Sequence, residues 1–445
     1  EPYPREHAGW WLLGLIWLIV LCTLFFYYYH PHRIFINSDN GWNILEIAYH
    51  DWGRDGVVKW WTDRSGALFI IVPQLLLEGF GLKRWVPHSH VYMWYVAACL
   101  FIGTAWLGRR VRTFLVAGPL LLALCLDWNG RAKVDSTVFS FWIPKIGAVP
   151  ILLVILTLIV MLWYLDRRRW SALAWASVVI SATAAMVQSP GNAVVLAVWG
   201  AVLCVIMPPR RRSEFVRLSL LAVALGAAYY ANQWVRTLYD HSVHVGKQTT
   251  PMTLQAAGFL RHMHMLWRAL HASGPALHIL LIAGGVITAV AVIRCMASYL
   301  RGATACVAMW HHRTLRCVTA LGVSAVVYLV LIAMNEWVQR NAGFIVNYSI
   351  PALLLLFAAC VWALQEVLVR LRGRWCIVLG SILLAAAGTA ALHMRPRATS
   401  AQYRAAARLL AYTNEFNGTV PLLGDFWQTY VHSYFDPHRL LSSNI

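Results

Sequence analysis

Charged side chains are scarce in this sequence. Of its 445 residues, Asp, Glu, Lys and Arg together make up 12%, whereas 60% are hydrophobic. Soluble domains carry about 25% charged residues, so this composition excludes an ordinary soluble protein. Lysine is the rarest of the four, with five copies among 37 basic residues, and this bias toward arginine favours a GC-rich bacterial source. Internal repeats and low-complexity linkers are also absent, which excludes a repeat array.

Apolar runs long enough to cross a bilayer recur along the whole chain. A further apolar run, Ala67–Leu82, contains Pro73 and Glu78, and we expect it to lie on the outer membrane surface or to dip into it. The sequence therefore predicts an all-α polytopic membrane protein. Its spans, about eleven in number, are expected near residues 10–29, 90–108, 113–126, 146–165, 171–187, 193–207, 215–234, 276–297, 317–334, 350–368 and 375–393.

Arginine clusters orient these spans, because they fall on alternate connections and the positive-inside rule makes such connections cytoplasmic. We expect the N-terminus inside, the C-terminus outside, and Trp10–Tyr29 as a signal anchor in a bacterial inner membrane. The outer connections are longer than most inner ones, so the working residues are expected to face the periplasm or exterior. The clusters lie at residues 109–112, 167–169, 210–212, 313–316 and 370–374.

Two regions are expected. Residues 1–393 form the membrane body, within which 30–89 is the first outer loop carrying surface helices. Residues 394–445 are more polar and are expected to begin a small outer domain, with helical spacing over Ala401–Tyr412 and a strand or loop at Gly424–Tyr430. We expect the protein to continue beyond both ends of this sequence.

Cysteine is missing from the predicted outer loops, so disulfide bonds are not expected to hold them. The net charge of +19 reflects mainly the arginines that orient the spans, and it is not taken as a sign of nucleic-acid binding. A smaller basic excess remains on the predicted outer side. It suits a bound phosphate or other anion, and it equally suits attraction to lipid headgroups.

The first outer loop places a carboxylate, Asp39, just after the first predicted span. Residues 40–52 have helical periodicity, with Glu46 and His50 on the polar face, so this helix is expected to lie along the membrane surface. Ser38, Asp39 or Asn40 would be the natural N-cap of this helix. Asp39 can therefore be a helix cap, a catalytic carboxylate, or both.

The order of features in the first 110 residues resembles the opening of the GT-C superfamily of glycosyltransferases, which includes lipid A aminoarabinose transferases and protein O-mannosyltransferases. The order is a span, Asp39, a surface helix, Arg64, the half-buried helix Ala67–Leu82, a second span and a basic stop. The resemblance implies that Asp39 is the catalytic residue and that Arg64 contacts a lipid-linked phosphate. Asn40 departs from the pattern, because many members have a second acidic residue there.

Such chemistry needs a base and phosphate stabilisation. A polyprenyl-phosphate sugar has a good leaving group, so Asp39 could act as the general base on an acceptor hydroxyl, while basic side chains neutralise the departing phosphate. A nearby carboxylate also favours an oxocarbenium-like transition state.

Two later outer segments offer further candidates. In the second outer loop, Asp135 could be another site carboxylate and Arg131 or Lys133 a phosphate ligand, although the same charges could be a solvated surface. In a late outer loop, Glu336 and Arg340 are four residues apart; they could pair along a helix, or Arg340 could bind a phosphate.

Metal binding is not favoured. The histidines of Arg261-His262-Met263-His264 are two apart, so on a helix they point away from each other, and no carboxylate is placed to complete a zinc site. No cofactor is expected; a divalent metal is possible but not favoured, because Asn40 stands where a second acidic residue would be.

The sequence thus predicts a glycosyltransferase that takes a sugar from a lipid-linked donor to a glycan, lipid or protein acceptor, with membrane lipids as its other partners. A transporter or flippase is one alternative, but charge is nearly absent from the span interiors and no repeat is visible. A polymerase or ligase of surface polysaccharide is another.

Overall fold

A computed structural model describes seven long stretches, a pair of short strands and a few scattered residues of the chain. Nearly all of the described residues are helical. They are residues 192–206, 212–243, 253–272, 275–300, 313–340, 345–370, 373–393, 420–424 and 440–444, with 12, 15, 16, 19, 176, 179, 180, 182, 183, 186, 407–409, 411 and 412.

Six long helices cover the last six predicted spans, and two shorter helices lie between them. Three of the long helices are long and apolar enough to cross a membrane, over Phe215–Trp234, His278–Ala297 and Leu315–Met334, which supports the prediction of a helical membrane protein. The predicted total of about eleven spans extends beyond the described residues. The helices are α9 (Asn192–Ile206), α10 (Arg212–Val243), α11 (Phe259–Ala272), α12 (Pro275–Leu300), α14 (Arg313–Met334), α15 (Glu336–Arg340), α16 (Ile345–Arg370) and α17 (Gly373–His393).

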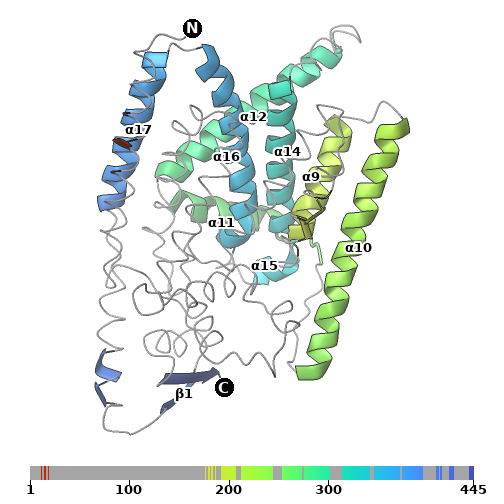
Figure 1. The fold of residues 1–445 in the computed structure, drawn as a ribbon, viewed down its shortest axis with the longest axis vertical. Coiled ribbons are helices and arrows are strands. Elements are labelled where there is room, and N and C mark those ends of the chain that lie inside the picture. Colours follow the sequence, from red (N-terminus) through yellow and green to blue (C-terminus); the bar gives the residue numbers. More distant parts are fainter. Residues whose placement is uncertain are drawn as a thin grey trace.

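Successive long helices run in alternating directions, so arginine-rich termini gather at one end of the bundle (Figure 1). Arg212 begins α10, Arg313 begins α14 and Arg370 ends α16, all near the top of that view. The opposite end carries α15, and we call it the α15 end. This alternation is the one that the arginine clusters predict, with the α15 end as the predicted outer side.

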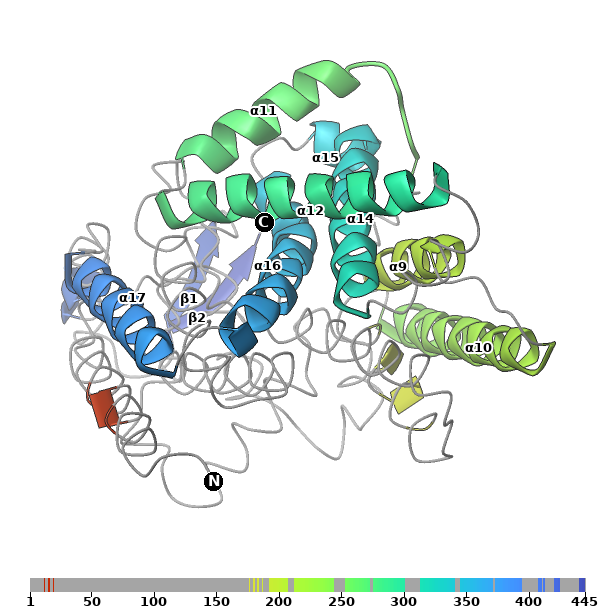
Figure 2. The same ribbon diagram turned by 90° about the horizontal axis from the view of Figure 1, so that it is seen from above.

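Helices α14 and α16 form the centre of the described bundle. In α16 every residue from Ala352 to Ala359 is buried, and a helix that is apolar and buried all round belongs in the middle of a bundle. Seen from above, these two helices lie between α17 on one side and α9 and α10 on the other (Figure 2). Helix α12 crosses and packs against both.

Small residues allow α12 to cross α14 and α16 at close distance. A Cβ atom added to Gly322 of α14 would lie 2.1 Å from Thr288 Oγ1, and one added to Gly284 would lie 3.1 Å from Leu356 Cβ of α16. Thr288 satisfies its hydroxyl within α12 by donating to the Gly284 carbonyl at 2.6 Å. Without a hydrophobic driving force between helices in lipid, such close approach of backbones is a main source of association.

The helices at the periphery of the described bundle expose apolar side chains, in contrast to the buried helix α16. Helices α10 and α12 leave large apolar side chains exposed along their outward faces, for example Val223 and Ile293, as expected where lipid replaces water. Beyond the helices, β1 (Val420–Gly424) and β2 (Leu440–Asn444) pair in parallel. The tail was expected to contain a strand or loop at Gly424–Tyr430, and β1 ends at the first residue of that segment.

Candidate functional site

A network of polar contacts lies at the α15 end, where residues 253–255 pair antiparallel with the α14–α15 corner. The Gln255 N–H donates to the Met334 carbonyl at 2.7 Å, and the Glu336 N–H donates to the Thr253 carbonyl at 2.9 Å. Leu254 and Asn335 form the bridge between these bonds. Helix C-termini leave carbonyls without intrahelical donors, and here a distant loop supplies one of the missing donors. We call this structure the polar junction.

Asn335 starts the short helix α15. Its side-chain Oδ1 accepts the Val338 N–H at 3.0 Å, which is the N-cap arrangement that Asn favours. The side chain is buried, so the cap is protected from water. The sequence of the corner thus fixes where the chain turns and where Glu336 is presented.

Two further side chains cross-link the loop to the corner. The Thr253 hydroxyl donates to Glu336 Oε2. Gln339 Nε2 donates to the Ala333 carbonyl at 2.9 Å and to the Gln255 carbonyl at 3.2 Å. The polar junction therefore holds a carboxylate, a hydroxyl and an amide in fixed positions, as is useful for binding the hydroxyl groups of a sugar.

The loop enters α11 through a glycine in a left-handed conformation. Gly258 has a φ of 86°, and its carbonyl lies 2.7 Å from Nδ1 of His262. Since a carbonyl can only accept, Nδ1 must carry the proton. The buried His262 thus has a structural role in closing the first turn of α11.

Gly258→Ala is expected to destabilise the polar junction by about 1–2 kcal/mol, the cost of a left-handed backbone for a residue with a Cβ. That Cβ would also lie 3.1 Å from the His262 ring. Thermal unfolding of the purified protein in detergent measures the loss. Gly258→Asn, which tolerates this backbone better, should lose less; equal stability of Gly258→Ala and wild type would contradict the expectation.

Helix α11 is amphipathic. His262 and Leu266 face the bundle, whereas Arg261, His264 and Arg268 are exposed. The prediction that His262 and His264 point away from each other is confirmed. At the flank of the cationic face, Leu260 and Trp267 are exposed by 80% and 54%. Aromatic and apolar groups beside cations are typical of a helix at a membrane surface.

Of the residues predicted to form the site, only Arg340 falls in the described part of the chain, where it ends α15 one turn after Glu336. The structure thereby places Arg340 next to the polar junction, which is built on the segments 335–340 and 253–258. The predicted catalytic and binding residues Asp39, Asp135, Arg64, Arg131, Lys133, Glu46 and His50 lie outside the described residues.

The sequence pointed to Arg340 as a phosphate ligand and to Glu336 as its possible partner along a helix, but not to Thr253 or Gln255. Their contact with the corner spans about eighty residues, and no local pattern reports it. The only sequence feature that could have pointed to these two residues is a polar stretch containing Pro251 just before an amphipathic helix. Among the described residues no group of three or more His, Cys, Asp or Glu could hold a metal ion.

Comparison with known proteins adds no family. No protein-family model matches the chain, and no curated protein matches it.

Proposed function

We propose that this protein is a membrane glycosyltransferase that moves a sugar from a polyprenyl-phosphate donor to an acceptor on the outer face of a bacterial inner membrane. The observation that carries the proposal is the order of Asp39, a surface helix and Arg64 between the first two predicted spans. A helical membrane body and a polar junction at the predicted outer end support it.

In this mechanism the carboxylate of Asp39 accepts the proton of the acceptor hydroxyl as that oxygen attacks C1 of the sugar. The bond from C1 to the phosphate oxygen breaks, and its electron pair leaves with polyprenyl phosphate. Arg64, with Arg131 or Lys133, neutralises the charge that develops on the phosphate, and Asp135 stabilises the positive charge on the ring.

The polar junction then serves the sugar or the phosphate. Glu336 carries a carboxylate held by Thr253, and such a group orients a sugar by accepting from its hydroxyls. Arg340 follows one helical turn later, and we assign it to the phosphate of the donor.

Arg340→Ala is expected to raise the KM for the lipid-linked donor by about 10- to 100-fold, as the loss of a hydrogen bond to a charged group costs about 1.5–3 kcal/mol. Arg340→Lys should restore part of the affinity. Arg374→Ala is the control, because Arg374 lies in the first turn of α17, at the end of the bundle opposite α15. An unchanged KM would instead leave Arg340 as a partner of Glu336 on α15.

The direct test is a transfer assay with the purified protein in liposomes. Radiolabelled polyprenyl-phosphate sugars are supplied with a membrane extract as the source of acceptors, and both labelled product and released polyprenyl phosphate are measured. Release of lipid phosphate in proportion to labelled product supports the proposal. Movement of the intact donor between leaflets without transfer would favour the flippase alternative, whereas lengthening of a glycan chain would favour the polymerase.

A further inference from the structure

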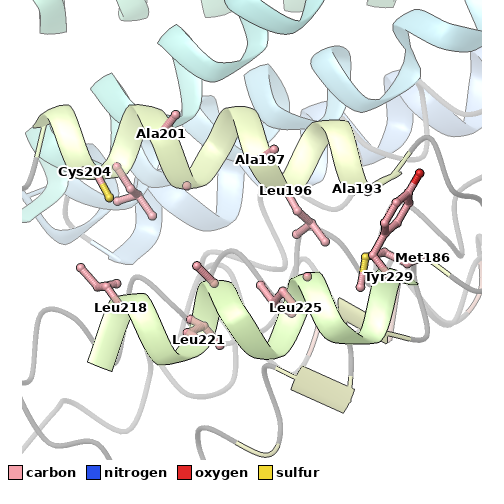
Figure 3. Close-up of a pocket in the computed structure, with 14 residues that line it drawn as sticks. Met186, Ala193, Leu196, Ala197, Ala201, Cys204, Leu218, Leu221, Leu225 and Tyr229 are labelled. Carbon is pink, nitrogen blue, oxygen red and sulfur yellow. The ribbon is translucent and has the colours of Figure 1, made fainter. Parts of the chain in front are cut away.

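An apolar slot of about 410 Å³ lies between α9 and α10 (Figure 3). Each helix contributes a stripe of residues spaced three or four apart, so one face of each helix lines the slot along its length. Among the lining side chains only that of Tyr229 carries an oxygen or nitrogen atom, and it lies at the end near Met186 and Ala193 (Figure 3). The principal lining residues are Ala193, Ala197, Gly200, Leu221, Gly226 and Tyr229.

The glycines of this slot do not serve close helix packing. A Cβ atom added to Gly200 or to Gly226 would meet no atom within 4 Å. At the crossing of α12 and α14, in contrast, a Cβ on Gly322 would collide with Thr288. The small residues of α9 and α10 therefore leave an unfilled volume between these helices, whereas those of α12 and α14 allow two helices to pack closely.

The length of the slot matches one leaflet of a bilayer. From Ala193 to Cys204 the axis of α9 rises about 16 Å, at about 1.5 Å per residue, and the hydrocarbon core of a bilayer is about 30 Å thick. Ala193 lies in the first turn of α9, and that end of α9 lies toward the α15 end of the bundle (Figure 1). The slot therefore extends from the α15 end toward the middle of the membrane.

The slot is continuous with the lipid-facing surface. Ala197, Ala201 and Ala222 line it and are also exposed, and α10 is one of the helices apolar and long enough to cross a membrane. A lipid chain can thus enter sideways from the bilayer. An empty apolar volume would forfeit the dispersion contacts of its walls, and water gains no hydrogen-bond partners there.

We propose that the slot between α9 and α10 binds one acyl chain of a membrane phospholipid from the leaflet on the α15 side, with its headgroup next to Tyr229. The Tyr229 hydroxyl lies at the mouth, where it can bond to the headgroup, as tyrosines at membrane interfaces do. One turn further along α10, the buried Asn232 donates to the Met186 carbonyl at 3.3 Å and holds the mouth together. This site is independent of the proposed sugar transfer.

The proposal can be tested by filling the slot with larger side chains. Gly200→Leu and Gly226→Leu place side chains in open space and should leave the fold intact; Ala197→Leu is a milder second variant. Gly285→Leu is the matched control, because Gly285 of α12 also has open space around its Cβ position but does not line the slot. The full-length protein is reconstituted in phosphatidylglycerol and phosphatidylethanolamine vesicles that contain a phospholipid with a diazirine on its acyl chain. After irradiation, labelled peptides are quantified by mass spectrometry.

We expect the wild type and Gly285→Leu to be labelled on both slot-lining stripes, at residues 193–204 and 218–229. Labelling there should fall about tenfold in the filled variants, equivalent to about 1.4 kcal/mol of binding, while labelling of the exposed face of α12 stays constant. Equal labelling in filled and wild-type protein would overturn the proposal. So would displacement of the probe by unlabelled polyprenyl phosphate but not by phospholipid, or cross-links from the slot to a second copy of the chain.

Discussion

Asp39→Asn is expected to abolish sugar transfer, with the rate falling by about 10²- to 10⁴-fold, the typical contribution of a general base. Asparagine has nearly the same shape as aspartate but cannot take a proton from the acceptor hydroxyl. Asparagine also caps helices as well as aspartate does, so this substitution removes the base while keeping a helix cap. Stability and expression should therefore match the wild type, and transfer in liposomes is the measurement.

Asp51→Asn is the matched control for this experiment, because Asp51 is another carboxylate of the same predicted loop to which no role is assigned. It should retain full transfer. Asp39→Ala separates the two roles further, since it removes the cap and should cost about 1 kcal/mol of stability in addition to activity. Near-normal transfer by Asp39→Asn would end the case for Asp39 as the base.

Among the substitutions that add one methyl group, Gly322→Ala is expected to cause the largest loss of stability. The added Cβ would lie 2.1 Å from Thr288 Oγ1 and 2.7 Å from Thr288 Cβ, so rotation of the threonine side chain cannot relieve the overlap and the two helices must separate. Overpacking of this kind costs about 1–3 kcal/mol and occasionally more. The thermal unfolding midpoint in detergent measures it.

The companion variants make the reason for that loss testable. Gly285→Ala adds the same methyl group to α12 in open space and should be neutral or slightly stabilising, because alanine is a better helix former than glycine. Thr288→Gly in the Gly322→Ala background removes the colliding atoms and should restore stability, apart from about 1 kcal/mol for the new helical glycine. Strictly additive effects of the two substitutions would mean that Gly322 and Thr288 do not interact.

The membrane helices could be predicted from the sequence because hydrophobicity and length alone define them. The predicted spans at 215–234, 276–297 and 317–334 fall within α10, α12 and α14. Their mutual packing could not be predicted. Gly322 and Thr288 come together only because α12 crosses α14, and nothing in the sequence around either residue reports that crossing.

The candidate site was predictable only in part for the same reason. Glu336 stands out as an acid at the end of an apolar run, yet its partner Thr253 lies 83 residues away. Helix α15 has only five residues, too few for periodicity to detect. The proposed roles of Asp39 and Arg64 rest on their order along the chain, and they stay predictions.

The buried position of α16 has a consequence for biogenesis. Chains are made from the N-terminus, and earlier segments begin to fold first, yet α16, the helix at the centre of the described bundle, leaves the ribosome after α12 and α14. Until Ala352–Ala359 have inserted, α12 and α14 lack the surface against which they pack. The space between α12 and α14 must therefore remain unfilled until α16 has inserted. A nascent chain that stops before α16 should be a substrate for membrane quality control.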